Sequence, residues 1–279
     1  MIQRARLPDG TELPALGQGT WHMGERGDRG AAEIAALRAG LDLGLTLIDT
    51  AEMYGEGGAE RIVGAAIAGR RDEVFLVSKV YPHNAGGKRL VAACEASLKR
   101  LGTGTIDLYL LHWRGAVPLA ETVAGLARLR EGGKIRFWGV SNLDADDMAE
   151  LAALPGGSAC ATDQVLYNPD QRGIEFDLLA WCAARAMPVM AYTPLGQAGT
   201  LLRSKALAEV GKRHGATPAQ VALAWCLRRP GIIAIPKAAT IAHVQANAAA
   251  ADLRLSPEDL ATIDATHPPP RRRTPLAML

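Results

Sequence analysis

The sequence predicts an α/β fold, a closed (β/α)8 barrel of the TIM type with an N-terminal β-hairpin and an extra C-terminal helix. Short apolar segments alternate with longer segments of helical periodicity eight times along the chain. The spacing is regular and no linker divides the chain, whose 279 residues suit a barrel of roughly 250 residues. An open doubly wound sheet of six strands would leave two units over. We therefore expect residues 1–279 to form one domain.

The elements follow in order from the N-terminus. Residues 2–7 and 11–16 flank Pro8-Asp9-Gly10, whose residue types favour a tight turn, so a hairpin is expected there. Strands are then expected at 16–20, 45–49, 74–80, 106–111, 135–140, 161–167, 188–193 and 232–235. Helices are expected at 31–43, 58–68, 88–101, 119–131, 145–154, 175–186, 218–228 and, as the extra C-terminal helix, 257–265.

Composition excludes several classes of partner. A formal net charge of +2 gives no electrostatic case for binding nucleic acid or an anionic membrane. The basic cluster Arg271 to Arg273 follows a run of prolines and is interpreted as a solvated tail. No segment has the apolar length of a membrane span or the pattern of a signal peptide. The four cysteines form no CxxC pair, which favours free thiols and a reducing cytoplasm. No heptad pattern or obvious apolar interface patch is visible, so a monomer is expected by default.

Polar side chains stand at or near the C-terminal end of nearly every expected strand. They are Asp49, Lys79, His112, Ser141, Asn142, Asp163, Gln164, Tyr192, Thr193 and Lys237, and Tyr54 follows Asp49 in a Gly-rich turn. In such barrels these strand ends share one rim, where enzymes of this architecture place their active sites. Trp21, Tyr81 and Trp113 also follow strands and are expected to line the mouth of that site.

Each of these residues alone has a structural explanation. Asp49 could cap a helix, Lys79 could end a strand in solvent, and His112 could be a hydrogen-bonded core histidine. Tyr54 could be half-buried packing. Their occurrence on one rim favours a site instead. The remaining histidines show no metal-ligand spacing, so no metal site is expected.

Taken together, these segments resemble the aldo-keto reductase family. The resemblance rests on Asp49-Thr50-Ala51-Glu52-Met53-Tyr54-Gly55, on Lys79, on Leu110-Leu111-His112-Trp113, on Gly139-Val140-Ser141-Asn142 and on Ile235-Pro236-Lys237. It covers the chain from Gly17 to Asn247. In detail the chain is similar to bacterial members that reduce methylglyoxal and related carbonyls.

The resemblance implies NADPH-dependent reduction of a small aldehyde or ketone, with four catalytic residues. Tyr54 would be the proton donor, and Lys79 would lower the pKa of its phenol. Asp49 would hold Lys79 in place, and His112 would orient the carbonyl. Trp21, Tyr81, His112 and Trp113 would contact the substrate. No GxGxxG motif opens a helix, so the phosphates are expected to be held without the classical dinucleotide fold.

The same resemblance implies a set of cofactor-binding residues. Ser141, Asn142 and Gln164 would bind the nicotinamide carboxamide, and Tyr192 would stack on its ring. The full implied set is Gly19, Thr20, Trp21, Asp49, Ser141, Asn142, Gln164, Tyr192, Thr193, Pro194, Leu195, Gly196, Gln197, Ile235, Pro236, Lys237, Ala238, Thr240, His243 and Asn247. Lys237 would meet the 2′-phosphate of NADPH and Asn247 the adenine.

The chain departs from the family pattern near the 2′-phosphate. Where the family often has a hydroxyl residue, this chain has Ala238, and the hydroxyl of Thr240 could take its place. Where many members have an arginine, this chain has His243. Because histidine loses its charge near neutral pH, we expect the preference for NADPH over NADH to be weaker or pH-dependent. Two alternatives remain open: a cofactor-binding regulatory module, and a sugar isomerase or aldolase on the same barrel. The four implied catalytic residues favour the reductase.

Overall fold

Eight parallel strands form a barrel at the centre of the computed structural model, which describes residues 2–279. The strands are β3 (Gln18–Gly19), β4 (Leu47–Asp49), β5 (Phe75–Val80), β6 (Ile106–Leu111), β7 (Ile135–Ser141), β8 (Asp163–Leu166), β9 (Val189–Tyr192) and β10 (Ile232–Ala234). Each strand pairs with its sequence neighbour from β3 to β10. Parallel bridges from Leu16 to Ala234 and from Gly19 to Lys237 close the ring, which confirms the predicted barrel.

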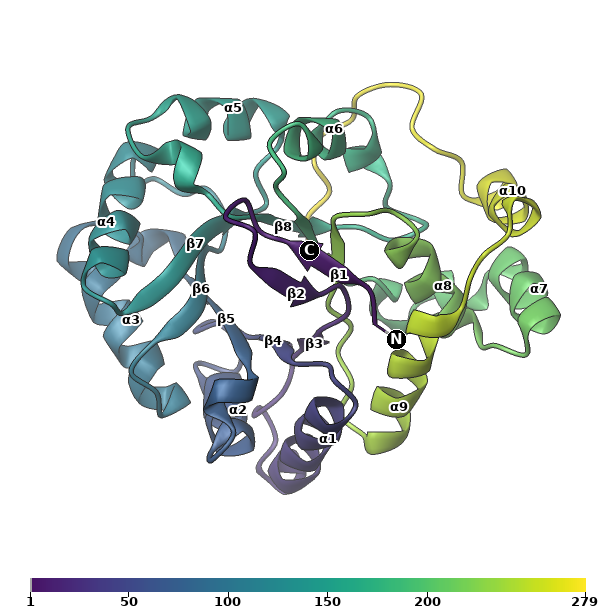
Figure 1. Ribbon diagram of the computed structural model, residues 1–279, viewed down its shortest axis with the longest axis horizontal. Coiled ribbons are helices and arrows are strands. Elements are labelled where there is room, and N and C mark those ends of the chain that lie inside the picture. Colours follow the sequence, from purple (N-terminus) through teal and green to yellow (C-terminus); the bar gives the residue numbers. More distant parts are fainter. Residues whose placement is uncertain (1) are drawn as a thin grey trace.

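The predicted hairpin lies across one end of the barrel. Strands β1 (Arg4–Arg6) and β2 (Glu12–Pro14) pair antiparallel, and Figure 1 shows them over the middle of the ring. Ala5, Leu7 and Leu13 are buried in the same apolar cluster as the barrel residues Leu47 and Phe75. The hairpin therefore covers this end with apolar side chains and leaves the opposite rim for the site.

Helices surround the barrel (Figure 1). They are α1 (Gly30–Asp42), α2 (Gly58–Ile67), α3 (Gly87–Leu101), α4 (Leu119–Glu131), α5 (Ala145–Ala153), α6 (Leu178–Ala183), α7 (Lys205–His214), α8 (Pro218–Leu227), α9 (Ile241–Ala249) and α10 (Pro257–Thr266). Helices α7 and α9 are not among those predicted. The helix expected at 175–186 is shorter, because a 3-10 turn precedes Asp177, whose side chain caps α6.

Other features of the fold bear on the expectations from composition. Among residues 2–279, no helix combines the length and apolar character needed to cross a membrane. The four cysteines are free and buried, as predicted. Within the same residues no cluster of three or more His, Cys, Asp or Glu side chains has the arrangement of a metal site.

Candidate active site

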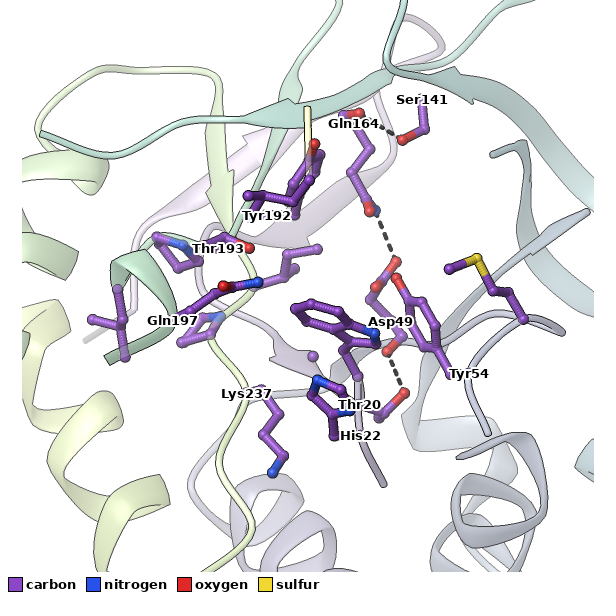
Figure 2. A pocket seen from close by; sticks show the side chains of 18 of the residues that line it. Thr20, His22, Asp49, Tyr54, Ser141, Gln164, Tyr192, Thr193, Gln197 and Lys237 are labelled. Carbon is purple, nitrogen blue, oxygen red and sulfur yellow. Dashed lines mark hydrogen bonds between the residues drawn. The ribbon is translucent and has the colours of Figure 1, made fainter. Parts of the chain in front are cut away.

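A cavity of about 690 Å³ opens at the rim formed by the C-terminal ends of the strands. Its walls come from several separate segments of the chain. The lining residues are Gly19, Thr20, Trp21, His22, Asp49, Met53, Tyr54, His112, Trp113, Ser141, Asn142, Gln164, Tyr192, Thr193, Pro194, Leu195, Gln197, Ala198, Ile235, Pro236, Lys237, Met278 and Leu279. Most of the residues selected from the sequence therefore lie around one cavity. Figure 2 shows ten of the lining residues labelled, with Asp49 and Tyr54 on one side.

Lys79 is fully buried behind this wall and uses all three of its donors. Its Nζ donates to Asp49 Oδ2 at 2.8 Å, to the backbone oxygen of Thr50 at 2.9 Å and to Tyr54 Oη at 3.1 Å. Strand β5 carries Lys79 and its neighbour β4 carries Asp49, so the parallel register brings the two side chains together. The turn after β4 then returns Tyr54 to the same ammonium.

Asp49 also connects this group to the residues expected around the cofactor. Its Oδ1 accepts a hydrogen bond from Gln164 Nε2 at 2.8 Å, and its backbone oxygen accepts one from Thr20 Oγ1 at 2.9 Å (Figure 2). Gln164 lies on β8, 115 residues further along the chain. Both carboxylate oxygens of Asp49 are therefore hydrogen-bonded, which fixes the side chain in one orientation.

Burial and charge act in opposite directions on the pKa values of this group. Burial alone would lower the pKa of Lys79, but Asp49 and Tyr54 outweigh it and raise that pKa, so Lys79 is charged. Burial raises the pKa of Tyr54 and the Lys79 ammonium offsets only part of this rise. Lys79 therefore lowers the pKa of Tyr54 as predicted, but the net pKa is raised because desolvation of the phenolate is the larger effect.

His112 is neutral. It follows β6, is only 8% exposed, and its ring lies edge-on to Tyr54 with 5.8 Å between ring centroids. Burial, with a contribution from the Lys79 ammonium, lowers the pKa of His112 to about 2. Its Nδ1 is buried without a hydrogen-bond partner among residues 2–279.

Three further polar side chains are joined around the end of β7. Ser141 Oγ donates to the backbone oxygen of Gln164 at 2.7 Å, and Asn142 Nδ2 donates to the backbone oxygen of His112 at 3.1 Å. Tyr192 Oη donates to Asn142 Oδ1 at 2.9 Å. Asn142 has a φ of 61°, in the left-handed region that Asn tolerates better than most residues. These bonds fix one cluster of amide and hydroxyl groups beside His112.

The opposite part of the cavity carries a cation. Figure 2 shows Lys237 on the side of Thr193 and Gln197, away from Tyr54. Among residues 2–279, no carboxylate forms an ion pair with Lys237, unlike Lys79. Thr193 and Gln197 have φ values of 51° and 54°, so the segment between them turns sharply along the cavity wall. An ammonium without a carboxylate partner can bind an anionic group such as a phosphate.

Some residues selected from the sequence lie outside the cavity wall. Besides Lys79 behind the wall, they are Tyr81, Asp163, Gly196, Ala238, Thr240, His243 and Asn247. Tyr81 instead packs edge-on against Trp113 at 6.0 Å, so it supports the wall without forming it. The hydroxyl of Thr240 accepts a hydrogen bond from the His243 amide and caps α9, which leaves its O–H as a donor, so its predicted substitution for the hydroxyl missing at Ala238 stays a prediction. The predicted adenosine contacts of His243 and Asn247 stay predictions.

Other lining residues were not selected from the sequence. His22, Met53 and Ala198 adjoin selected residues, so proximity along the chain was the available signal. His22 stacks on Trp21 with 4.2 Å between ring centroids and pairs with Glu25 at 2.9 Å. Met278 and Leu279 reach the cavity from the C-terminal segment, which no local pattern indicates.

Comparisons with known proteins identify the family. The model of the aldo/keto reductase family matches residues 15–267. The chain belongs to the aldo/keto reductase family. It is 58% identical to methylglyoxal reductase YeaE of Escherichia coli (strain K12), over 96% of this chain and 95% of that protein.

A second relative of this aldo/keto reductase is glyoxal reductase of Bacillus subtilis (strain 168), which is 33% identical over 93% of this chain and 91% of that protein. Among solved structures, an aldo/keto reductase from Klebsiella pneumoniae in complex with NADP and acetate has a TM-score of 0.98. It is 53% identical, and the match covers 100% of both chains. The family and barrel predicted from the sequence are confirmed.

Proposed function

We propose that this aldo/keto reductase reduces small reactive aldehydes and ketones, in particular 2-oxoaldehydes, to alcohols with NADPH. The observation that carries the proposal is the contact of Lys79 Nζ with both Asp49 Oδ2 and Tyr54 Oη beside neutral His112, at the wall of an open cavity. This arrangement offers a proton and a hydrogen bond to a carbonyl oxygen. The relatives named as methylglyoxal and glyoxal reductases support the same substrate class.

Tyr54 is the proton donor in this proposal. When bound, reduced nicotinamide supplies the hydride that forms the new C–H bond. The carbonyl oxygen then takes the proton of the Tyr54 phenol and becomes the alcohol. Because burial raises the pKa of Tyr54, the phenol is protonated at neutral pH and ready to donate.

Lys79 and Asp49 act on the phenolate that remains after the proton has left. The charged Lys79 ammonium, 3.1 Å from Tyr54 Oη, stabilises the negative charge that develops there. Asp49 keeps Lys79 charged and in place through its 2.8 Å ion pair. The contribution of Lys79 is therefore larger for the phenolate than for the resting phenol, which is the condition for lowering a barrier.

His112 would orient the substrate. A neutral imidazole has one N–H donor, and at neutral pH the low pKa of His112 prevents it from competing with Tyr54 as the acid. The ring lies beside Tyr54 in the cavity wall. A carbonyl oxygen placed between the two rings would accept hydrogen bonds from both.

The residues around the cavity fit an NADP(H) cofactor. Ser141, Asn142 and Gln164 offer amide and hydroxyl groups that match a carboxamide, which both donates and accepts. The Tyr192 ring would stack on the nicotinamide. The Lys237 ammonium, free of carboxylate partners among residues 2–279, would bind a phosphate. The structure from Klebsiella pneumoniae in complex with NADP supports this choice of cofactor.

We further propose a cytoplasmic monomer in which residues 1–279 form one domain. Four free, buried thiols support a reducing compartment. The exposed large apolar side chains, which are Leu43, Phe176, Ile241, Met278 and Leu279, come from several separate elements, which supports a chain without an obligate partner. Light scattering at micromolar concentration measures the mass, and a dimer would contradict this part of the proposal.

The decisive experiment measures NADPH oxidation at 340 nm with methylglyoxal, glyoxal, an aliphatic aldehyde and a ketone. We expect turnover, with kcat/KM highest for the 2-oxoaldehydes, and weaker activity when NADH replaces NADPH. Tight NADPH binding without turnover of any carbonyl would contradict the proposal and support the regulatory alternative. Binding is followed separately by the change in protein fluorescence on titration with NADPH.

A further inference from the structure

The C-terminal segment, residues 268–279, returns from α10 to the active-site rim. Figure 1 shows this yellow segment arching from α10 past α6 and ending near the middle of the ring. At its start, His267 is held by Asp170 through Nδ1 at 2.6 Å and by Ser204 through Nε2 at 2.8 Å. At its end, Met278 and Leu279 line the cavity. The segment therefore joins a fixed point on the helical layer to the wall of the site.

One arginine in the middle of this segment binds three carboxylates. Arg273 Nη1 lies 2.7 Å from Asp146 Oδ2, Nη2 lies 3.4 Å from Asp144 Oδ2, and Nε lies 3.0 Å from Asp177 Oδ2. We name this group, Arg273 with Asp144, Asp146 and Asp177, the tail latch. Arg271 to Arg273 are all exposed, as predicted for a solvated tail, but Arg273 is also held by these ion pairs.

The carboxylates of the latch are held in place by the helices. Asp144 caps α5 through Oδ1, which leaves Oδ2 for Arg273. Asp177 likewise caps α6 through Oδ1 and binds Arg273 through Oδ2. Asp146 lies in the first turn of α5. The latch thus attaches the tail to the ends of two helices that the barrel already positions.

The latch limits where the end of the chain can lie. Met278 is five residues from Arg273 and eleven from His267. An extended chain spans at most about 3.5 Å per residue, so the reach of Met278 is roughly 18 Å from the latch but roughly 38 Å from His267. Leu276 is partly buried against the apolar core and adds a weaker attachment between the latch and the cavity.

We propose that Arg273 is a positioning residue that sets substrate selectivity by holding Met278 and Leu279 in the cavity wall. The inference rests on the proposed function and names what controls the size of its substrate. With the latch closed, the two side chains restrict the cavity and favour a small 2-oxoaldehyde. The Arg273 side chain is 42% exposed, so salt screens its ion pairs and selectivity falls as ionic strength rises.

The test compares two 2-oxoaldehydes that differ only in the group beside the dicarbonyl, methylglyoxal and phenylglyoxal. Arg273→Ala removes the latch, Arg273→Lys keeps the charge without the fork of donors, and Arg272→Ala is the matched control. Relative to wild type in 20 mM NaCl, we expect Arg273→Ala to lower the ratio of KM for phenylglyoxal to KM for methylglyoxal by about fivefold. Arg273→Lys should fall between, and Arg272→Ala should match wild type.

Two further readouts separate the latch from the proposed function. Wild type in 500 mM NaCl should shift toward the ratio of Arg273→Ala, and hydrogen–deuterium exchange of residues 274–279 should be faster in Arg273→Ala. An unchanged KM ratio in Arg273→Ala would overturn the inference, whether or not the exchange of residues 274–279 changes. If wild type reduces neither substrate, the proposed function fails, while the exchange measurement still decides whether Arg273 holds the tail.

Discussion

Replacing Lys79 by Met tests how the catalytic group is held together. The change removes three hydrogen bonds and the positive charge, and it leaves the Asp49 carboxylate, whose side chain is only 3% exposed, with Gln164 as its remaining side-chain donor. Breaking a buried ion pair in this way costs about 3–5 kcal/mol of unfolding free energy. Tyr54 also loses the cation that stabilises its phenolate.

A second substitution separates stability from chemistry. In the double variant Lys79→Met/Asp49→Asn no uncompensated charge is buried, and the Asn oxygen can still accept from Gln164. We expect it to be about 1–2 kcal/mol less stable than wild type, and therefore more stable than Lys79→Met alone. Both variants should lose at least about a hundredfold in kcat, because neither supplies the ammonium beside Tyr54.

The assays are urea unfolding followed by circular dichroism at pH 7, and NADPH oxidation with methylglyoxal. A Lys79→Met protein that unfolds within about 1 kcal/mol of wild type would refute the claim that the pair is interdependent. A double variant that is less stable than Lys79→Met alone would refute it as well. Recovery of turnover in the double variant would refute the role assigned to Lys79.

The remaining predictions concern pH, backbone packing and the cofactor. The pKa of His112 in the folded protein is depressed to about 2, so its contribution to stability is present above pH 6.5 and is lost as pH falls. Between pH 6.5 and 4, wild type should therefore lose roughly 3 kcal/mol more unfolding free energy than His112→Gln, as measured by urea unfolding. Gly24→Ala should lower the melting temperature, because its Cβ would lie 2.3 Å from the Gly58 backbone at a φ of +73°. The added Cβ of Gly27→Ala meets nothing within 4 Å, so that control should melt like wild type. His243→Ala should raise the Kd of NADPH at pH 7, because it removes the ring expected near the 2′-phosphate, and an unchanged Kd would exclude His243 from phosphate binding.

Local pattern was sufficient for the barrel and for most of the cavity wall. The strand at Ile106–Leu111 and the helix at Leu119–Glu131 have the predicted bounds, because each is a continuous run of one periodicity. The oxidoreductase prediction is confirmed by the family to which the chain belongs. The segments around Asp49 and Lys79 indicated a common site because neighbouring parallel strands bring their C-terminal ends together.

What the sequence does not reveal depends on contacts between distant segments. The bond between Gln164 and Asp49 spans 115 residues, and the ion pairs of Arg273 depend on where two helices begin. The raised pKa of Tyr54 depends on burial, which a motif does not report. Helix α7 (Lys205–His214) was missed although its buried residues lie on one face, because it follows the irregular turn at Gln197 and was not separated from that loop.

The most direct test of the central claim is the effect of Tyr54→Phe on turnover. The substitution removes one hydroxyl and leaves the aromatic ring beside His112, so binding of NADPH measured by fluorescence should stay within about twofold of wild type. The kcat for methylglyoxal should fall by about 10²- to 10⁴-fold, the usual contribution of a positioned general acid. A Tyr54→Phe protein that binds NADPH and reduces methylglyoxal at a rate near that of wild type would contradict the account.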